Sequence, residues 1–99
     1  MQIDLFTIFP EVCPAYLSSS ILRRAHELGA LNVVVHDIRS YANDRHRVTD
    51  DAPYGGGGGM VMKPEPIFSA VEAVLGHRKD IIPIILMTPQ GRLFSQRIA

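Results

Sequence analysis

The residues best placed to do chemistry lie in one stretch, residues 50–63, which read DDAPYGGGGGMVMK. Ordering a glycine costs roughly 0.5–1 kcal/mol more than ordering an alanine in regular structure, so five in succession need a physical reason. One reason is a backbone that must adopt angles, or approach a ligand, in ways that a Cβ would prevent. We therefore interpret residues 54–59 as a bare-backbone loop shaped to lie against a flat or anionic ligand. A disordered surface loop is the alternative.

Polar side chains gather around this loop, and their chemistry suits a nucleic acid. Carboxylates and an imidazole can steer a proton or a base, arginines can contact phosphates, and a tyrosine can stack on a base. Solvation of a surface loop explains the same charges, so spacing alone leaves both interpretations open. The residues are Asp44, His46, Asp50 and Asp51, then Arg45 and Arg47, and finally Tyr54.

Several familiar sites are not predicted. A GxGxxG dinucleotide motif would need a glycine where Met60 stands, and no Gly-Lys pair supports a phosphate-binding P-loop. The four histidines are far apart and there is one cysteine, so we expect no metal site. Cys13 alone excludes an internal disulfide and fits a reducing compartment; we interpret it as a small buried apolar residue.

The composition predicts one small globular domain. The chain has 99 residues, 46% of them hydrophobic, and its ten Lys and Arg balance ten Asp and Glu. The net charge is therefore zero and gives no indication of a nucleic-acid or membrane partner. Grouped arginines can still form a local basic face. No segment approaches the ~18 apolar residues of a membrane span, and the N-terminus lacks signal-peptide features. We expect a cytoplasmic protein with no membrane partner.

The elements that would position the loop begin with a strand–helix–strand unit. Residues 3–8 and 31–36 are short apolar runs that predict strands, the second buried on both faces. Between them, serines 18–20 can cap a helix over residues 21–28 with Gly29 after it; residues 12–17 are expected to be irregular or one helical turn. This order favours a parallel sheet.

The second half predicts a loop, a helix and a third strand. Residues 37–51 are polar and aperiodic, and Pro64 or Pro66 can open a helix that ends near Gly76. Residues 81–87, IIPIILM, predict a central strand, and residues 93–99 the start of an amphipathic helix. Because ligands bind beyond the carboxyl ends of parallel strands, residues 88–92 are the second candidate site. We expect this loop and the glycine loop to share one cavity. The buried face of the predicted helix would be Ile67, Phe68, Ala70, Val71, Val74 and Leu75.

A set of motifs in a fixed order connects the chain to a known family. They are Pro10-Glu11, ILRRA at 21–25, Asp44-Arg45-His46, DDAPYGGGGGMVMKPEPI at 50–67, and TPQGR at 88–92. Together they resemble the bacterial tRNA (guanine-N1)-methyltransferases, members of the SPOUT superfamily. The resemblance runs from about residue 3 to the last residue and covers only the N-terminal part of the longer family enzyme.

The resemblance implies a fold, an activity and a set of partners. The fold is α/β, a parallel-sheet SPOUT-type domain, here truncated before its trefoil knot is completed. Residues 1–99 would be the N-terminal part of the S-adenosylmethionine-binding domain, without the C-terminal tRNA-binding domain. The family methylates N1 of the guanosine 3′ of the anticodon of tRNA, using S-adenosylmethionine, and builds its active site as a homodimer.

Site residues follow only where motifs match. The first donor-contacting loop corresponds to Leu86, Met87, Thr88, Pro89 and Gly91, and the guanine loop to Tyr54, Gly55, Gly56, Gly57, Gly58 and Gly59. Gly58 stands where the family often has proline. The family's aspartate base would lie beyond Ala99, so we assign no catalytic residue and expect the isolated chain to be inactive. Two alternatives are a non-catalytic dimerisation or binding fragment, and a nucleotide-binding α/β domain unrelated to methylation.

Overall fold

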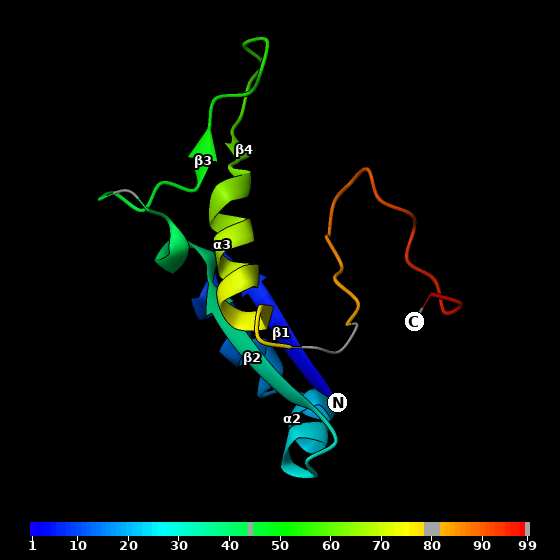
Figure 1. Cartoon of the computed structure of the whole chain (residues 1–99). Helices are drawn as coiled ribbons and strands as arrows, with labels where there is room; N and C mark the ends of the chain where they lie inside the picture. The colour runs from blue at the N-terminus through cyan, green and yellow to red at the C-terminus, as the bar shows by residue number, and fades with distance from the viewer. Residues whose placement is uncertain (44, 79–81, 99) are drawn as a thin grey trace.

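The computed structural model describes residues 1–43, 45–78 and 82–98, and Figure 1 shows how the elements follow one another along the chain. An N-terminal strand–helix–strand unit is followed by a short two-stranded arm and one long helix. In order, the elements are β1 (Gln2–Thr7), η1 (Pro10–Val12), α1 (Cys13–Leu17), α2 (Ser20–Glu27), β2 (Asn32–Asp37), η2 (Ile38–Tyr41), β3 (Asp50–Asp51), β4 (Val61–Met62) and α3 (Pro64–Leu75).

The two long strands pair in parallel, as predicted. Their register runs from Gln2 opposite Asn32 to Thr7 opposite Asp37. The register begins at the chain terminus, where the N-terminal ammonium group donates to the Ala30 carbonyl at 2.9 Å. A parallel pair needs a crossover between its strands, and α1 and α2 supply it. The α/β class with a parallel sheet is therefore confirmed.

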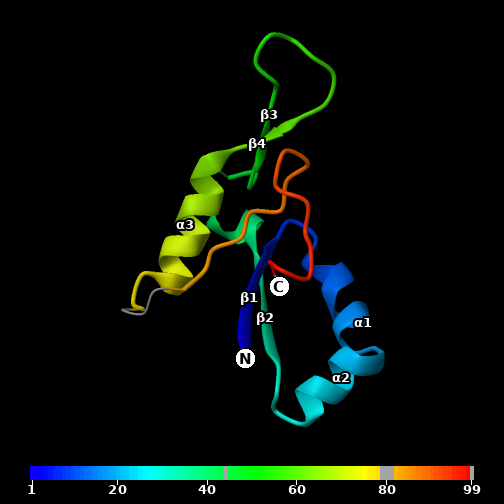
Figure 2. The ribbon, with the colours of Figure 1, turned by 90° about the vertical axis from the view of Figure 1, so that its right-hand side faces the viewer.

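Helices cover both faces of this strand pair. Figure 2 shows α3 on one side of β1 and β2, and α1 and α2 on the other. In the described part of the chain, the buried hydrophobic side chains are Leu31 before β2, Ile38 in η2, and Ala70 on α3, and of these only Ala70 is fully enclosed. The core therefore centres on the contact between α3 and the segment around β2, and it is small. The Cys13 side chain is only half-buried, not fully buried as expected.

Helix α2 begins and ends where the sequence predicts, but its capping and burial differ. Ser19 occupies the N-cap position, yet its hydroxyl donates back to the Ala15 carbonyl at 2.6 Å and does not cap the helix. Gly29 takes a left-handed conformation, φ +67°, directly beyond the helix. Ile21 and Leu28 remain 69% and 82% exposed, so the helix buries less of its apolar face than its spacing suggested.

Helix α3 also has the predicted bounds. Pro64 at the first helical turn needs no hydrogen-bond partner for its nitrogen, so proline is well placed there. Pro66 and Ala70 are buried, but Phe68 is 65% exposed, and its prediction as a buried residue was wrong.

The predicted third strand is not formed over residues 82–87, and Ile81 lies outside the described residues. Figure 1 shows this orange segment away from the β1–β2 pair. Ile84, Ile85 and Leu86 are about 69–75% exposed. An apolar β-branched run favours a strand only where a neighbouring strand can receive its backbone hydrogen bonds. The helix predicted over 93–99 is likewise reduced, over the described residues 93–98, to a turn in which the Ile98 amide donates to the Ser95 carbonyl. Ala99 lies outside the described residues.

Candidate functional site

A short antiparallel arm carries the glycine stretch. In β3 and β4, Asp50 pairs with Met62 and Asp51 with Val61, and the Lys63 amide donates to the Thr49 carbonyl at 2.7 Å. Figure 1 shows the arm projecting beyond the first turn of α3, with the glycines at its tip. The sequence analysis missed this pairing, because two-residue strands are too short to show an alternating pattern.

Three glycines at the tip have a conformational reason to be glycine. Gly55, Gly56 and Gly59 have φ values of +84°, +73° and +96°, a region that residues with a Cβ seldom enter. The Gly56 amide donates to the Pro53 carbonyl at 3.3 Å and closes the turn. The tip is therefore a shaped turn whose backbone conformation depends on glycine.

Gly57 and Gly58 have no such reason within the fold. Neither has a φ in the left-handed region. A Cβ added at Gly58 would meet nothing within 4 Å, and one at Gly57 only the Pro53 side chain at 4.0 Å. Neither the local backbone nor the packing of the described chain therefore requires glycine at these two positions.

An open cavity of about 810 Å³ lies at the base of the arm. This volume is within the range of small-molecule and cofactor sites, roughly 300–1,000 Å³. Its walls combine two tyrosines, a lysine and carboxylates with apolar side chains of the arm. They come from the end of η2 and the residues after it, the arm, and the start of α3: Tyr41, Ala42, Asn43, Val48, Asp51, Ala52, Tyr54, Val61, Met62, Lys63, Pro64, Glu65 and Pro66. Of the predicted guanine loop, Tyr54 alone lines this cavity; the five glycines extend beyond it.

The polar residues before the arm are mostly exposed. Arg45 and Arg47 are exposed, and Asp50 is half-buried. The Asp51 carboxylate accepts a hydrogen bond from the Ala52 amide at 2.8 Å, so part of its role is to shape the turn. Asp44, which the sequence placed in the same cluster, lies outside the described residues.

The second predicted loop forms a compact turn. The Gly91 amide donates to the Thr88 carbonyl at 3.1 Å, and a Cβ on Gly91 would lie 3.2 Å from that carbonyl oxygen. Leu86 and Met87 are 75% and 84% exposed, and Pro89 is exposed. The segment therefore combines exposed apolar side chains with a tight turn closed by glycine.

Neither the cavity at the arm nor a second, smaller one contains residues of both predicted loops. No residue of the described segment 82–98 lines the 810 Å³ cavity or the second one, a groove of about 220 Å³ beside α1 and α2. The expected convergence is therefore not found in this structure. The reason is the same as for the missing strand: without pairing of residues 82–87 to the sheet, nothing brings residues 88–91 to the arm.

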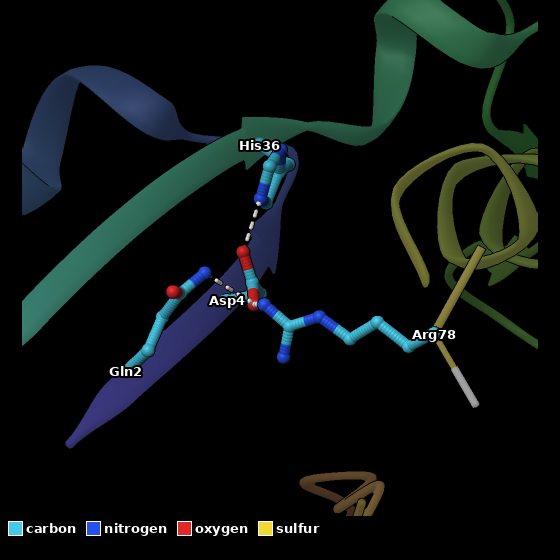
Figure 3. A network of polar contacts seen from close by, with 4 residues as sticks. All are labelled: Gln2, Asp4, His36 and Arg78. Carbon is cyan, nitrogen blue, oxygen red and sulfur yellow. Dashed lines mark hydrogen bonds and ion pairs between the residues drawn. The ribbon is translucent and has the colours of Figure 1, made fainter. Parts of the chain in front are cut away.

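A polar network around the nearly buried Asp4 carboxylate on the strand pair was not predicted. Figure 3 shows the Asp4 carboxylate with three donor groups around it. His36 Nε2 lies 3.0 Å from Oδ1, Gln2 Nε2 lies 3.3 Å from Oδ2, and Arg78 Nη2 lies 3.6 Å from Oδ2. The Phe6 ring stacks on the imidazole with centroids 4.9 Å apart. The signal in the sequence was one ionisable residue within each apolar run, Asp4 in the first and His36 in the second.

The network determines the charge state of Asp4. The hydrogen bond from His36 is the largest influence lowering the pKa of the Asp4 carboxyl, assisted by Gln2 and Arg78, and it outweighs the opposing effect of burial. Its side chain is only 10% exposed, so the carboxylate depends on these partners for solvation. None of the four residues lines either cavity, so the network is structural in its position.

One buried hydroxyl has no such partners. Thr49, immediately before β3, is 1% exposed, and its Oγ1 has no hydrogen-bond partner in the described part of the chain.

Among the described residues, no group of three or more His, Cys, Asp or Glu side chains could hold a metal ion. None of the described helices has the length and apolar character needed to cross a membrane.

Comparison with known proteins connects this geometry to a family. The sequence model of the family described as "tRNA (Guanine-1)-methyltransferase TrmD" matches residues 1–99. A protein of Thermomicrobium roseum named tRNA (guanine-N(1)-)-methyltransferase is 50% identical over the whole chain, which covers 37% of that relative. A protein of the same name from Geobacter sulfurreducens is also 50% identical, with 40% of it covered.

A solved structure supports the same fold. The crystal structure of tRNA (m1G37) methyltransferase from Aquifex aeolicus superposes with a TM-score of 0.69 at 36% identity. The match covers 77% of this chain and 34% of that one. The chain thus spans well under half the length of the relatives it matches.

Proposed function

This chain belongs to the tRNA (guanine-1)-methyltransferase family, and from that premise we propose that it takes part in methyl transfer to tRNA. The donor would be S-adenosylmethionine and the acceptor N1 of the guanosine 3′ of the anticodon. The observation that carries the proposal is the tip of the arm, where Gly57 and Gly58 leave an open, side-chain-free backbone that the fold itself does not require.

The arm would receive the target guanine. A purine is flat, and a backbone without Cβ atoms allows its ring to approach the peptide N–H and C=O groups closely. Tyr54 is fully exposed beside the cavity, where its ring can stack on a base. Arg45 and Arg47, exposed before the arm, would contact phosphates and position the tRNA without reading its sequence.

The donor would be held by the turn at 88–91 and the residues before it. Leu86 and Met87 offer exposed apolar surface for the adenosine, with Thr88, Pro89 and Gly91 forming the turn. S-adenosylmethionine, when bound, supplies an electrophilic methyl group on sulfur. The protein's contribution is to hold that methyl and guanine N1 in line, about 3–3.5 Å apart.

The acceptor nitrogen carries a proton that must leave when the new N–CH3 bond forms. A general base is needed for this step. We assign that role to none of Asp50, Asp51 or the other described carboxylates of this chain. We therefore propose that the chain by itself does not turn over. In the active assembly, we propose a cytoplasmic homodimer in which residues 1–99 form the N-terminal part of a trefoil-knot SPOUT domain.

A second candidate function is that of a non-catalytic dimerisation or binding fragment of the same fold. The separation of the two loops favours it, because the described cavity at the arm contains no residue of the donor loop. This candidate predicts tRNA or self-association without affinity for S-adenosylmethionine.

A methyl-transfer assay tests whether the chain alone is inactive, and binding measurements distinguish the two candidate functions. The chain is mixed with radiolabelled S-adenosylmethionine and a tRNA carrying guanosine after the anticodon, with a matched tRNA carrying adenosine there as the control. Turnover by the chain alone would contradict its proposed inactivity.

Calorimetric titration with S-adenosylhomocysteine separates the two candidates, since binding is expected only for the methyltransferase. Fluorescence anisotropy with the tRNA should weaken in Arg47→Gln, with a shallower dependence on salt.

A further inference from the structure

Just after α3, the side chain of Arg78 forms an ion pair with Asp4 on β1. Arg78 follows the helix by three residues, and its backbone amide donates to the Leu75 carbonyl at 2.9 Å. Its side chain reaches across to the β1 carboxylate of Asp4, as Figure 3 shows, with Nη2 3.6 Å from Oδ2. The backbone bond fixes Arg78 to the last helical turn, so whatever holds its guanidinium also holds the end of α3.

The carboxylate that receives Arg78 is pre-organised. Asp4 is 10% exposed, and the groups facing it are Gln2 on the same strand, His36 on β2, and Arg78 after α3. His36 is itself fixed by its stacking on Phe6. An ion pair between two exposed, mobile side chains contributes little, because both must be ordered to form it. Here one partner is already held in place, and the arginine, 37% exposed, is the mobile one.

We propose that Asp4 is a positioning residue that tethers the end of α3 to β1 through Arg78. The tether fixes the end of α3, from which the chain continues toward the apolar run whose described part is residues 82–87. It does not depend on the proposed function. Its consequence for the donor-binding turn at 88–91 does rest on that function, because the turn follows this run directly.

A distance measurement between the helix and the sheet tests the tether. Spin labels are placed at Ala73→Cys on α3 and Asn32→Cys on β2, both exposed, in a Cys13→Ser background. Pulsed electron paramagnetic resonance then gives the distribution of distances between them. Asp4→Asn and Arg78→Gln should each broaden the distribution toward longer distances. Arg78→Lys should restore part of the narrow distribution, since the ammonium keeps the charge without the guanidinium's fork.

The double variant and a matched control complete the experiment. The distance distribution of the double variant, Asp4→Asn with Arg78→Gln, should be no broader than that of Asp4→Asn alone, because Asp4→Asn already removes the contact with Arg78. Arg24→Gln, an exposed arginine on α2, should leave the distribution unchanged. Circular dichroism checks that each variant is folded. If Asp4→Asn fails to fold, Arg78→Gln decides the matter alone. An unchanged distribution in folded Arg78→Gln, or additive broadening in the double variant, would overturn the tether.

Discussion

The imidazole of His36 lies 3.0 Å from the Asp4 carboxylate, although the two residues are not opposite each other in the sheet. Asp4 is paired with Val34, and His36 with Phe6, so the contact runs diagonally between the parallel strands. Side chains alternate between faces with a period of two, which places Asp4 and Phe6 on the same face of β1. The sheet therefore carries a charged centre beside the aromatic ring of Phe6, which stacks on the His36 imidazole.

This centre should make the protein sensitive to acid. The pKa of Asp4 is below its ordinary value of 3.8 in the folded chain, chiefly through the hydrogen bond from His36. The unfolded chain then binds the proton more readily, so protonation favours unfolding. The stabilisation that the ionised Asp4 carboxylate gives the folded chain is complete above pH 3.8. It is lost as the pH falls through the lower pKa of the folded state. Urea denaturation measured from neutral pH downward should show the free energy of unfolding decreasing in that acidic window.

Asp4→Asn should remove this dependence and lower stability at neutral pH by about 1–3 kcal/mol, because His36, Gln2 and Arg78 lose the charged acceptor that they share. The matched control is Glu11→Gln, an exposed carboxylate on η1, which should keep the acidic decline. If the stability of the Asp4→Asn variant falls in the acidic window as steeply as that of the parent, other carboxylates are responsible.

The glycines of the arm should separate into two classes when replaced by alanine. At Gly55 and Gly59, with φ of +84° and +96°, alanine should lower stability or reshape the turn, at a cost of about 1–2 kcal/mol. Alanine at Gly58 meets open space, and at Gly57 it makes only an ordinary contact with Pro53, so both substitutions should be neutral or stabilising by up to about 1 kcal/mol. Thermal denaturation of the four variants measures the contrast.

The same four variants test the guanine loop. Under the proposed function, Gly57→Ala and Gly58→Ala should weaken tRNA binding although they keep the fold, because a methyl group would hold the purine away from the backbone. Equal tRNA affinity in these two variants and the parent would indicate that glycine there serves neither the fold nor this ligand.

Thr49 provides a test of a buried hydroxyl without a partner. Its Oγ1 is buried and makes no hydrogen bond within the described residues. Thr49→Val keeps the shape and removes the unsatisfied group, so it should stabilise the chain by about 1 kcal/mol. Thr49→Ser keeps the hydroxyl but loses a buried methyl, and should destabilise it by a similar amount. Chemical denaturation of the pair should therefore show opposite signs; a loss of stability in Thr49→Val would point to a hydrogen bond formed in solution.

The sequence predicted the elements whose signals are local. The apolar runs of β1 and β2, the serine and glycine around α2, and the proline at the start of α3 all mark boundaries within a few residues of themselves. The parallel order followed from strand–helix–strand connectivity. The glycine run and the position of residues 88–92 after an apolar run selected the two candidate sites, and the family motifs then assigned a ligand to each.

What could not be predicted depends on partners distant in sequence. The Asp4–His36–Arg78 network joins three segments whose proximity is decided only by the fold. The exposure of Ile21, Leu28 and Phe68 reflects how little surface is available to cover them, which helical spacing does not report. Each position had the right residue type for burial, but a partner surface is needed as well.

The apolar run at 82–87 makes the same point in a form that can be measured. Ile85 is 75% exposed, whereas Ala70 is fully buried on α3. Ile85→Lys should therefore change the free energy of unfolding by no more than about 0.5 kcal/mol, as for other exposed positions. It should also reduce self-association in light scattering, because an exposed apolar run promotes aggregation. Ala70→Leu, which forces extra volume into the packed contact, should cost about 1–3 kcal/mol. If Ile85→Lys instead destabilised the chain as much as Ala70→Leu, the run would be packed against the sheet in solution, as the sequence first suggested.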